Sequence, residues 1–365
     1  MTTIYSNGIP VPRIDDSRCF FHNRLTLIIG PTGSGKSALT QHILNSLRNT
    51  VPVVIVACPT AVMNGDYNGI IPEQCTYDDL TKPLIQRIFQ RQENVVEMYT
   101  RVHDLTYITP LFRMTADPEA RAKVDKLDVI FRNGCHDIRS TFDPSDVDSG
   151  IDDLTERYKK KLTKLMRGSI NAHKVSLHSM HLTDVQRSVL NNFNINPSLL
   201  LIADDCMATV KEWSGLEETK KLFYQGRHYH ISTIMLCQAT TLLSPQFRSN
   251  AHITIFTTEQ VVNSYVKKET SGYSKDESKK ISKIAETIFT SNQDSNRPNY
   301  KKLALMGPLI STDFSVQYII GTPRKKRFGS IVLWKICDAV KKDSSDIVNN
   351  SFNKMFSIKS VPTIG

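Results

Sequence analysis

The sequence predicts an α/β fold, in which a mainly parallel β-sheet carries helices on both faces. Apolar segments of strand length alternate with helical patterns between residues 25 and 100, and again from residue 199 onward. A glycine-rich octapeptide joins the first of these strands to the first helix. A pair of aspartates ends a later strand. Together these observations predict a sheet whose strand ends form an anion-binding site.

The octapeptide at residues 30–37 has the pattern G-x-x-x-x-G-K-S/T, preceded by the apolar strand 25–29 and followed by a helical pattern over 37–47. Its glycines let successive backbone N–H groups face an anion, and the helix N-terminus adds partial positive charge. Lys36 is expected to reach the β- and γ-phosphates, and Ser37 to ligate Mg²⁺. We therefore predict a Walker A loop of an ASCE or RecA-like P-loop NTPase, with ATP and Mg²⁺ as cofactors, rather than an ordinary glycine turn. The predicted nucleotide-binding residues are Gly30, Pro31, Thr32, Gly33, Ser34, Gly35, Lys36 and Ser37.

The next predicted elements are a strand at 53–57, a loop rich in turn residues, and a helix at 81–100. Between residues 101 and 197 the alternation of strand and helix stops, which indicates a long, largely helical insert. An acidic stretch at 143–156 precedes a basic stretch at 157–167.

Four apolar or aromatic residues fall near one face of a helix through the basic stretch: Leu154, Tyr158, Leu162 and Leu165. The segment is thus either a solvated amphipathic helix packed on the domain or a helix whose cations contact DNA phosphates.

The α/β pattern returns after the insert. The predicted elements are strands at 199–203, 232–236, 253–256, 303–306 and 316–320, and helices at 216–225 and 275–289. We expect an N-terminal extension at 1–22, a P-loop ATPase domain at 23–340 that includes the insert, and a flexible tail at 341–365.

Asp204 and Asp205 follow the apolar strand 199–203 directly, which is the Walker B arrangement. Asp204 is expected to bind Mg²⁺, and Asp205 to orient or deprotonate the attacking water. Asp205 is one methylene shorter than the glutamate usual at this position, and a turn or helix-cap pair is the alternative interpretation. Gln238 ends a strand that should neighbour the Walker B strand, where its amide could contact the γ-phosphate or the attacking water.

Two arginines could complete the site of a neighbouring subunit. Arg227 lies just after the helix that follows Walker B, and Arg248 follows the strand that ends in Gln238. An arginine supplied in trans stabilises the charge on the transferred phosphoryl group. A surface arginine or a structural ion pair is the alternative for each of them.

Two further clusters carry weaker signals. His173, His178 and His181 crowd one segment, but no cysteine pair or carboxylate spacing supports a metal site there. The basic run 324–327 could contact DNA, act as a nuclear address, or simply be solvated charge.

The composition is that of a globular protein, and its basic charge balance favours a polyanionic partner. The chain has 365 residues, 40% of them hydrophobic and 22% charged, and its net charge is +10. The seven cysteines include no C-x-x-C pair, which is typical of small core residues in a reducing compartment. The first residues are polar, and no apolar stretch approaches the ~20 residues of a bilayer span. We therefore expect an intracellular protein.

Several segments resemble the DNA-packaging ATPases of large DNA viruses, of the poxvirus type, within the FtsK–HerA branch of P-loop motors. The resemblance is carried by residues 199–205, 224–228, 232–238 and 247–250, and by the loop 59–72. It covers about residues 20–100 and 198–325 and leaves the insert out. The resemblance implies a homo-oligomeric ring, pentameric or hexameric, that uses ATP to thread double-stranded DNA into a capsid. It also implies that Arg227 acts in trans, and that capsid or vertex proteins are partners.

The family resemblance further implies a host location in the cytoplasmic virus factory or the nucleus, or association with the virion. Two other functions stay open from the residues. One is a nucleotide-switched virion assembly protein, in which binding matters more than turnover. The other is a P-loop nucleoside or nucleotide kinase, which would need an acceptor pocket and no Walker B acid pair.

Overall fold

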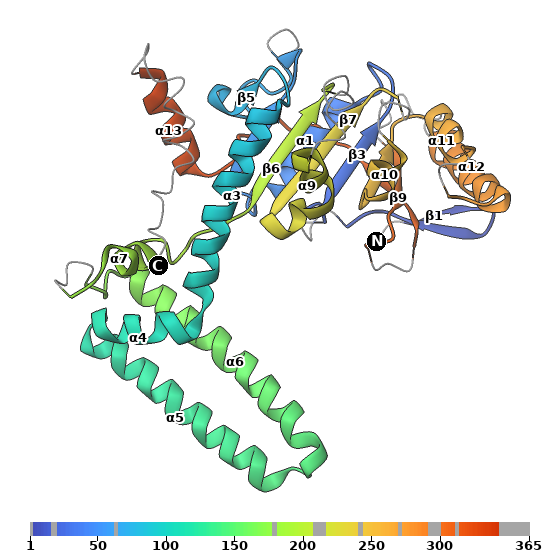
Figure 1. Cartoon of the computed structure of the whole chain (residues 1–365). Helices are drawn as coiled ribbons and strands as arrows, with labels where there is room; N and C mark the ends of the chain where they lie inside the picture. Colours follow the sequence, from blue (N-terminus) through green and yellow to red (C-terminus); the bar gives the residue numbers. More distant parts are fainter. Residues whose placement is uncertain are drawn as a thin grey trace. The chain divides into compact units, whose positions relative to one another are not determined.

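The computed structural model describes residues 3–15, 20–61, 65–176, 181–206, 217–239, 244–268, 272–290, 301–310 and 314–342. Within these residues the chain divides into two compact units. The sheet unit comprises residues up to 92 and from 197 onward, and the helical unit comprises residues 93–196. Figure 1 shows the helices and strands of both units.

The sheet unit is built on one mixed sheet, which is eight-stranded in the described residues and has the order β10-β9-β8-β3-β7-β6-β4-β5. The strands from β8 to β5 are parallel, whereas β9 and β10 are antiparallel additions at one edge. The predicted α/β fold with a mainly parallel sheet and helices on both faces is thereby confirmed. The strand bounds are β3 Leu25–Ile29, β4 Val53–Ala57, β5 Thr76–Tyr77, β6 Leu199–Asp204, β7 Ile231–Cys237, β8 Ile253–Phe256, β9 Lys301–Met306 and β10 Val316–Ile320.

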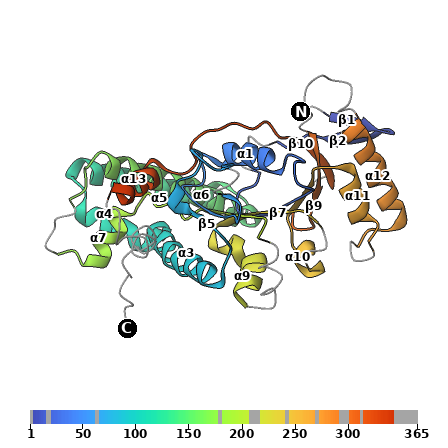
Figure 2. The same cartoon turned by 90° about the horizontal axis from the view of Figure 1, so that it is seen from above.

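The central strands are buried on both faces, which explains their continuous apolar sequences. Alternate side chains of β3 enter two separate cores: Leu27 faces one and Ile28 the other. The first core is covered by the start of α3 (Lys82–His103) and by α9 (Glu217–Gln225), α11 (Glu259–Val266) and α12 (Lys275–Thr290). The second core is covered by α1 (Lys36–Leu47) and α13 (Ile331–Lys342). Figure 2 shows α1 and α9 on opposite sides of the strands.

The strand order separates the strand before the phosphate loop from the strand that carries the acidic pair. β7 lies between β3 and β6 and pairs in parallel with both. Because the carboxyl ends of these three strands lie at one edge of the sheet, the residues that follow them are neighbours in space.

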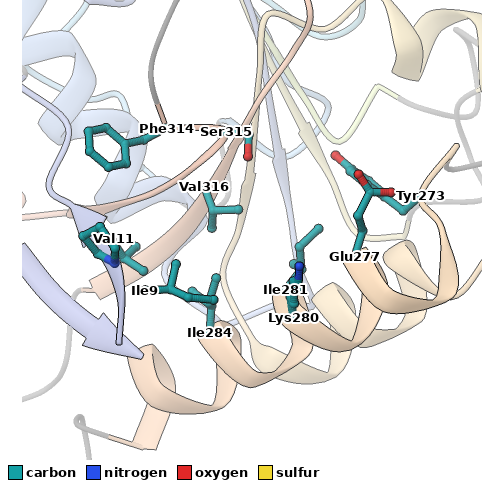
Figure 3. Close-up of a pocket in the computed structure, with 11 residues that line it drawn as sticks. Ile9, Val11, Tyr273, Glu277, Lys280, Ile281, Ile284, Phe314, Ser315 and Val316 are labelled. Atoms are coloured by element: carbon teal, nitrogen blue, oxygen red, sulfur yellow. The ribbon is translucent and has the colours of Figure 1, made fainter. Parts of the chain in front are cut away.

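The N-terminal residues join the sheet unit as a hairpin of β1 (Thr3–Ser6) and β2 (Ile9–Pro12). Asn7 and Gly8 form its turn with φ values of 49° and 80°, as a two-residue hairpin turn requires. The hairpin, α12 and β10 line an apolar groove of about 300 Å³, and Figure 3 shows residues from all three elements around it.

The helical unit consists of the second half of α3, α4 (Leu105–Thr115), α5 (Pro118–Thr141), α6 (Pro144–Asn171) and α7 (Asp184–Asn191). Its core is separate from the two cores of the sheet unit. α5 and α6 pack against each other, and the ring of Phe131 stacks on that of Tyr158 with centroids 4.4 Å apart. Leu162 and Met166 are buried in this core. The basic stretch therefore lies on a helix with one apolar side buried in this core, and contact of its cations with DNA stays a prediction.

The exposed surface of α6, outside its buried stripe, carries a cluster of cations, which we call the α6 lysine face. Its members are Lys159, Lys160, Lys161, Lys164 and Arg167. In this cluster Lys159 pairs with Glu156 at 2.9 Å across an exposed surface, and such a pair contributes little to stability.

Within the described residues, no helix combines the length and the apolar character needed to span a bilayer. None of the six cysteines in this part of the chain forms a disulfide, and five of them are buried. α13, the short strand β5 and the N-terminal hairpin were not predicted. Of the predicted tail, residues 343–365 lie outside the described residues, and residues 341–342 end α13.

Candidate nucleotide-binding site

The octapeptide forms a loop after β3 and its last two residues begin α1. Three of its positions need glycine. Gly33 and Gly35 have φ values of +76° and +89°, which residues with a side chain rarely adopt. At Gly30, an added Cβ would lie 1.7 Å from the hydroxyl oxygen of Thr257. No side chain caps the first turn of α1, so its backbone N–H groups are left for an anion.

The Lys36 side chain folds back over this loop. Its Nζ donates to the backbone oxygens of Gly30 at 2.8 Å and Pro31 at 3.0 Å. Burial lowers the pKa of the amine, and the charges of Asp204 and Asp205 oppose that shift. The cation thus lies at the mouth of the loop, beside the predicted acidic pair, where a phosphate oxygen would compete with the two carbonyls.

Asp205 and Gln238 meet at the carboxyl ends of β6 and β7. The Gln238 amide nitrogen donates to both carboxylate oxygens of Asp205, each at 2.9 Å. Asp205 has a φ of +61°, a left-handed conformation that aspartate tolerates better than most residues. The expectation that the Gln238 strand neighbours the Walker B strand is confirmed. The catalytic roles of the two residues stay predictions.

Asp204 is only 9% exposed, and its Oδ2 accepts a hydrogen bond of 2.8 Å from the hydroxyl of Tyr67. Burial raises the pKa of this carboxyl group. The Ser37 hydroxyl donates to Oδ2 of Asp66 at 2.9 Å. Neither Asp66 nor Tyr67 was predicted to belong to the site. Their place in a turn-rich loop after a parallel strand is the signal that could have indicated them.

A hydroxyl and carboxylates are the hard oxygen donors that Mg²⁺ prefers, so Ser37 and Asp204 fit the predicted ion. No group of three or more His, Cys, Asp or Glu residues in the described chain could hold a metal by itself. A Mg²⁺ held here would therefore take phosphate oxygens as further ligands. His173 and His181 form no metal site in the described part, and His178 lies outside it.

Lys302 is a second lysine at the loop, and nothing in the sequence pattern indicated it. It lies on β9, is 8% exposed, and donates to the backbone oxygens of Ser34 at 2.9 Å and Thr257 at 3.2 Å. Burial lowers the pKa of its amine. Lys302 therefore ties the phosphate loop to the end of the neighbouring strand β8.

The two candidate arginines lie away from the phosphate loop of their own chain. Arg227 is exposed and precedes β7, whereas Gln238 follows it. A seven-residue strand spans about 20 Å, so Arg227 is at the opposite edge of the sheet from the phosphate loop. Arg248, on α10 (Pro245–Ser249), is 8% exposed, with its guanidinium 5.9 Å from the centre of the Tyr265 ring. Of the two arginines, only Arg227 is exposed.

No protein-family model matches the chain. The uncharacterized protein B354L of African swine fever virus is 26% identical over 365 residues, which cover 96% of this chain and 97% of that protein. The uncharacterized protein 015R of Frog virus 3 is 31% identical over 115 residues, which cover 30% of this chain and 34% of that protein. Both relatives are proteins of large DNA viruses.

Two solved structures are similar to this chain at low sequence identity. One is the genome packaging NTPase B204 of Sulfolobus turreted icosahedral virus 2 in complex with ATP-gammaS, with 10% identity and a TM-score of 0.35, covering 84% of this chain and 98% of that one. The other is the bacterial conjugative coupling protein TrwB, with 13% identity and a TM-score of 0.32, covering 91% of this chain and 90% of that one.

Proposed function

We propose that this protein is a Mg²⁺-dependent ATPase that moves double-stranded DNA into a viral capsid. The ATPase activity is proposed because three segments that are far apart in the sequence lie together at one edge of the sheet. The phosphate loop, Asp205 and Gln238 follow the adjacent strands β3, β6 and β7. This is the arrangement that triphosphate hydrolysis requires: an anion cradle, a carboxylate for the water, and an amide beside it.

Each residue has a distinct role in this proposal. Lys36 and the loop N–H groups hold the β- and γ-phosphates, while Ser37 and Asp204 hold Mg²⁺, which neutralises charge on the phosphate oxygens. Asp205 accepts the proton of the attacking water or orients that water. Gln238 holds the Asp205 carboxylate through two hydrogen bonds. A γ-phosphate or water that competes for the amide would release the carboxylate for the reaction.

Arg227 would complete the site of a neighbouring subunit in a homo-oligomeric ring, pentameric or hexameric. Its exposure at the sheet edge opposite its own phosphate loop supports action in trans. A guanidinium placed there cannot stabilise phosphoryl charge in its own chain, about 20 Å away.

Binding of DNA would use the α6 lysine face of the helical unit. Its cations are exposed, while the other side of α6 is packed against α5. The net charge of +10 supports a polyanionic partner. The assignment to genome packaging rests on the sequence segments that resemble viral packaging ATPases. It is consistent with the source of the two relatives, which are proteins of large DNA viruses.

The test of the proposed function follows the γ-phosphate of labelled ATP in the purified full-length protein. We expect release of free phosphate. Asp205→Asn should abolish it while ATP binding persists, and Lys36→Ala should abolish both. Asp152→Asn, at an exposed position on α6, is the matched control and should leave turnover unchanged. Transfer of label to a nucleoside or nucleotide acceptor would indicate a kinase. Virion assembly that persists with Asp205→Asn would indicate a nucleotide switch.

A further inference from the structure

Two consecutive residues of the loop after β4 reach the two predicted Mg²⁺ ligands from one side. Asp66 accepts the hydrogen bond of the Ser37 hydroxyl at 2.9 Å, and Tyr67 donates to Oδ2 of Asp204 at 2.8 Å. Ser37 belongs to the phosphate loop and Asp204 to the end of β6, so these two contacts link both halves of the site to a third segment.

This loop segment is fixed in place rather than loosely apposed. Gln41 lies one turn after Ser37 on α1, is 8% exposed, and donates from its side chain to the backbone oxygen of Asp66 at 3.2 Å. The Tyr67 ring is 4% exposed in the core beneath the loop. The backbone N–H of Ile71 donates to the backbone oxygen of Tyr67 at 3.1 Å and closes the turn. Asp66 is thus held through both its side chain and its backbone by one face of α1.

The direction of each hydrogen bond determines which oxygen lone pairs remain for a cation. A serine hydroxyl has one proton and two lone pairs. With its proton committed to Asp66, both lone pairs of Ser37 are available on the other side of the oxygen. Tyr67 donates to only one oxygen of Asp204, and this leaves Oδ1 of that carboxylate for coordination. Partners of this kind orient metal ligands. As an acceptor, Asp66 also raises the basicity of the Ser37 oxygen, whereas the Tyr67 donor fixes the orientation of the Asp204 carboxylate.

We propose that Asp66 and Tyr67 are positioning residues for the Mg²⁺ site: Asp66 orients the Ser37 hydroxyl, and Tyr67 orients the Asp204 carboxylate. This inference rests on the proposed function, because it assumes that Mg²⁺ and a nucleoside triphosphate bind at the phosphate loop. Asp66 also places a negative charge beside that site, which favours a bound cation and disfavours a triphosphate without one.

The opposite effects on metal and nucleotide provide a test that a merely structural role would not pass. The full-length protein is titrated with a fluorescent, non-hydrolysable ATP analogue in EDTA, and then with Mg²⁺ at fixed analogue concentration. Mn²⁺ binding to the same complex is followed by electron paramagnetic resonance. Thermal unfolding without ligand reports whether each variant is folded.

We expect Asp66→Ala to raise the Mg²⁺ concentration for half-maximal effect by about 10–100-fold, the usual cost of losing a metal ligand's own partner. Its affinity for the metal-free analogue should be unchanged or higher, because a like charge has been removed. Asp66→Asn keeps an oxygen acceptor for Ser37 and should lose less than Asp66→Ala. Tyr67→Phe should weaken Mg²⁺ binding about 10-fold. Asp78→Asn, an exposed carboxylate farther along the chain, is the matched control.

Unchanged Mg²⁺ and Mn²⁺ affinity in both Asp66→Ala and Tyr67→Phe would overturn the inference. An equal loss of analogue affinity with and without Mg²⁺ would also overturn it, because that pattern indicates a structural role. Failure of the wild-type protein to bind the analogue at all is a separate result. It would overturn the proposed function itself.

Discussion

Substitution of Gly30 by alanine tests whether the phosphate loop needs the geometry described here. Gly30 directly follows β3, and its backbone N–H donates to the backbone oxygen of Cys237 at 3.0 Å, which fixes its position at the end of the sheet. A Cβ added at Gly30 would lie 1.7 Å from Oγ1 and 3.0 Å from Cβ of Thr257, and 2.8 Å from Oγ of Ser34. These contacts are far too short to persist.

The size of the required movement follows from these distances. Ordinary contact begins at 3.4 Å, so Thr257 or the loop must move by about 1.7 Å. Thr257 cannot swing away freely, because its hydroxyl is 2.6 Å from that of Ser34 and 3.3 Å from the oxygen of Ile29. Overpacking of this kind costs about 1–3 kcal/mol, and a displacement of about 1 Å at a reacting group can cost about 100-fold in rate. We expect ATP affinity to fall about 10–100-fold, with a lower Tm.

The assay combines binding of a fluorescent ATP analogue with thermal unfolding. Thr257→Ala removes the oxygen at 1.7 Å but keeps the Cβ at 3.0 Å, so the double variant should regain part of the lost affinity. Gly168→Ala, on α6 with no atom within 4 Å of the added Cβ, is the control. Wild-type affinity in Gly30→Ala, or a double variant no better than the single one, would refute this account of the loop.

Four further predictions concern other parts of the structure. Nδ1 of His252 accepts the backbone N–H of Leu25 at 3.1 Å, and burial together with the Arg227 and Arg24 charges lowers its pKa from 6.5 to about 4. Below pH 6.5 the unfolded chain therefore protonates this imidazole more readily than the folded chain does, and the free energy of unfolding should fall by up to about 3 kcal/mol as the pH drops from 6.5 to 4. A His252→Gln variant whose thermal unfolding has the same pH profile as the wild type would contradict this. Lys302→Met should weaken ATP binding about 10-fold, since a donor to two carbonyls at the loop is lost, and unchanged affinity would show that the loop holds its shape without it. Adding Arg227→Ala subunits to wild type should lower turnover more than in proportion to their fraction, whereas a linear fall would exclude a trans-acting arginine. Reversing the charges of the α6 lysine face should weaken DNA binding and flatten its dependence on salt, and an unchanged slope would leave that face as a solvated surface.

The parallel core could be predicted from the sequence because strands buried on both faces need continuous apolar residues. The short hairpin β1–β2 and the two-residue strand β5 lack that signal, and α13 was also missed. The Walker residues could be predicted because a local backbone shape dictates their spacing. Tyr67 and Asp204 lie 137 positions apart, and Lys302 lies 268 positions from Ser34. Contacts between such distant residues depend on how the strands are ordered, which local patterns do not encode.

The central claim is that ATP hydrolysis is coupled to DNA. Its most direct test is steady-state phosphate release from ATP at low salt, with and without long double-stranded DNA, using Lys36→Ala as the blank. The account predicts a clear rise in turnover when DNA is added, and loss of that rise as salt screens the DNA phosphates. Turnover that stays the same with and without DNA would contradict a DNA-translocating motor.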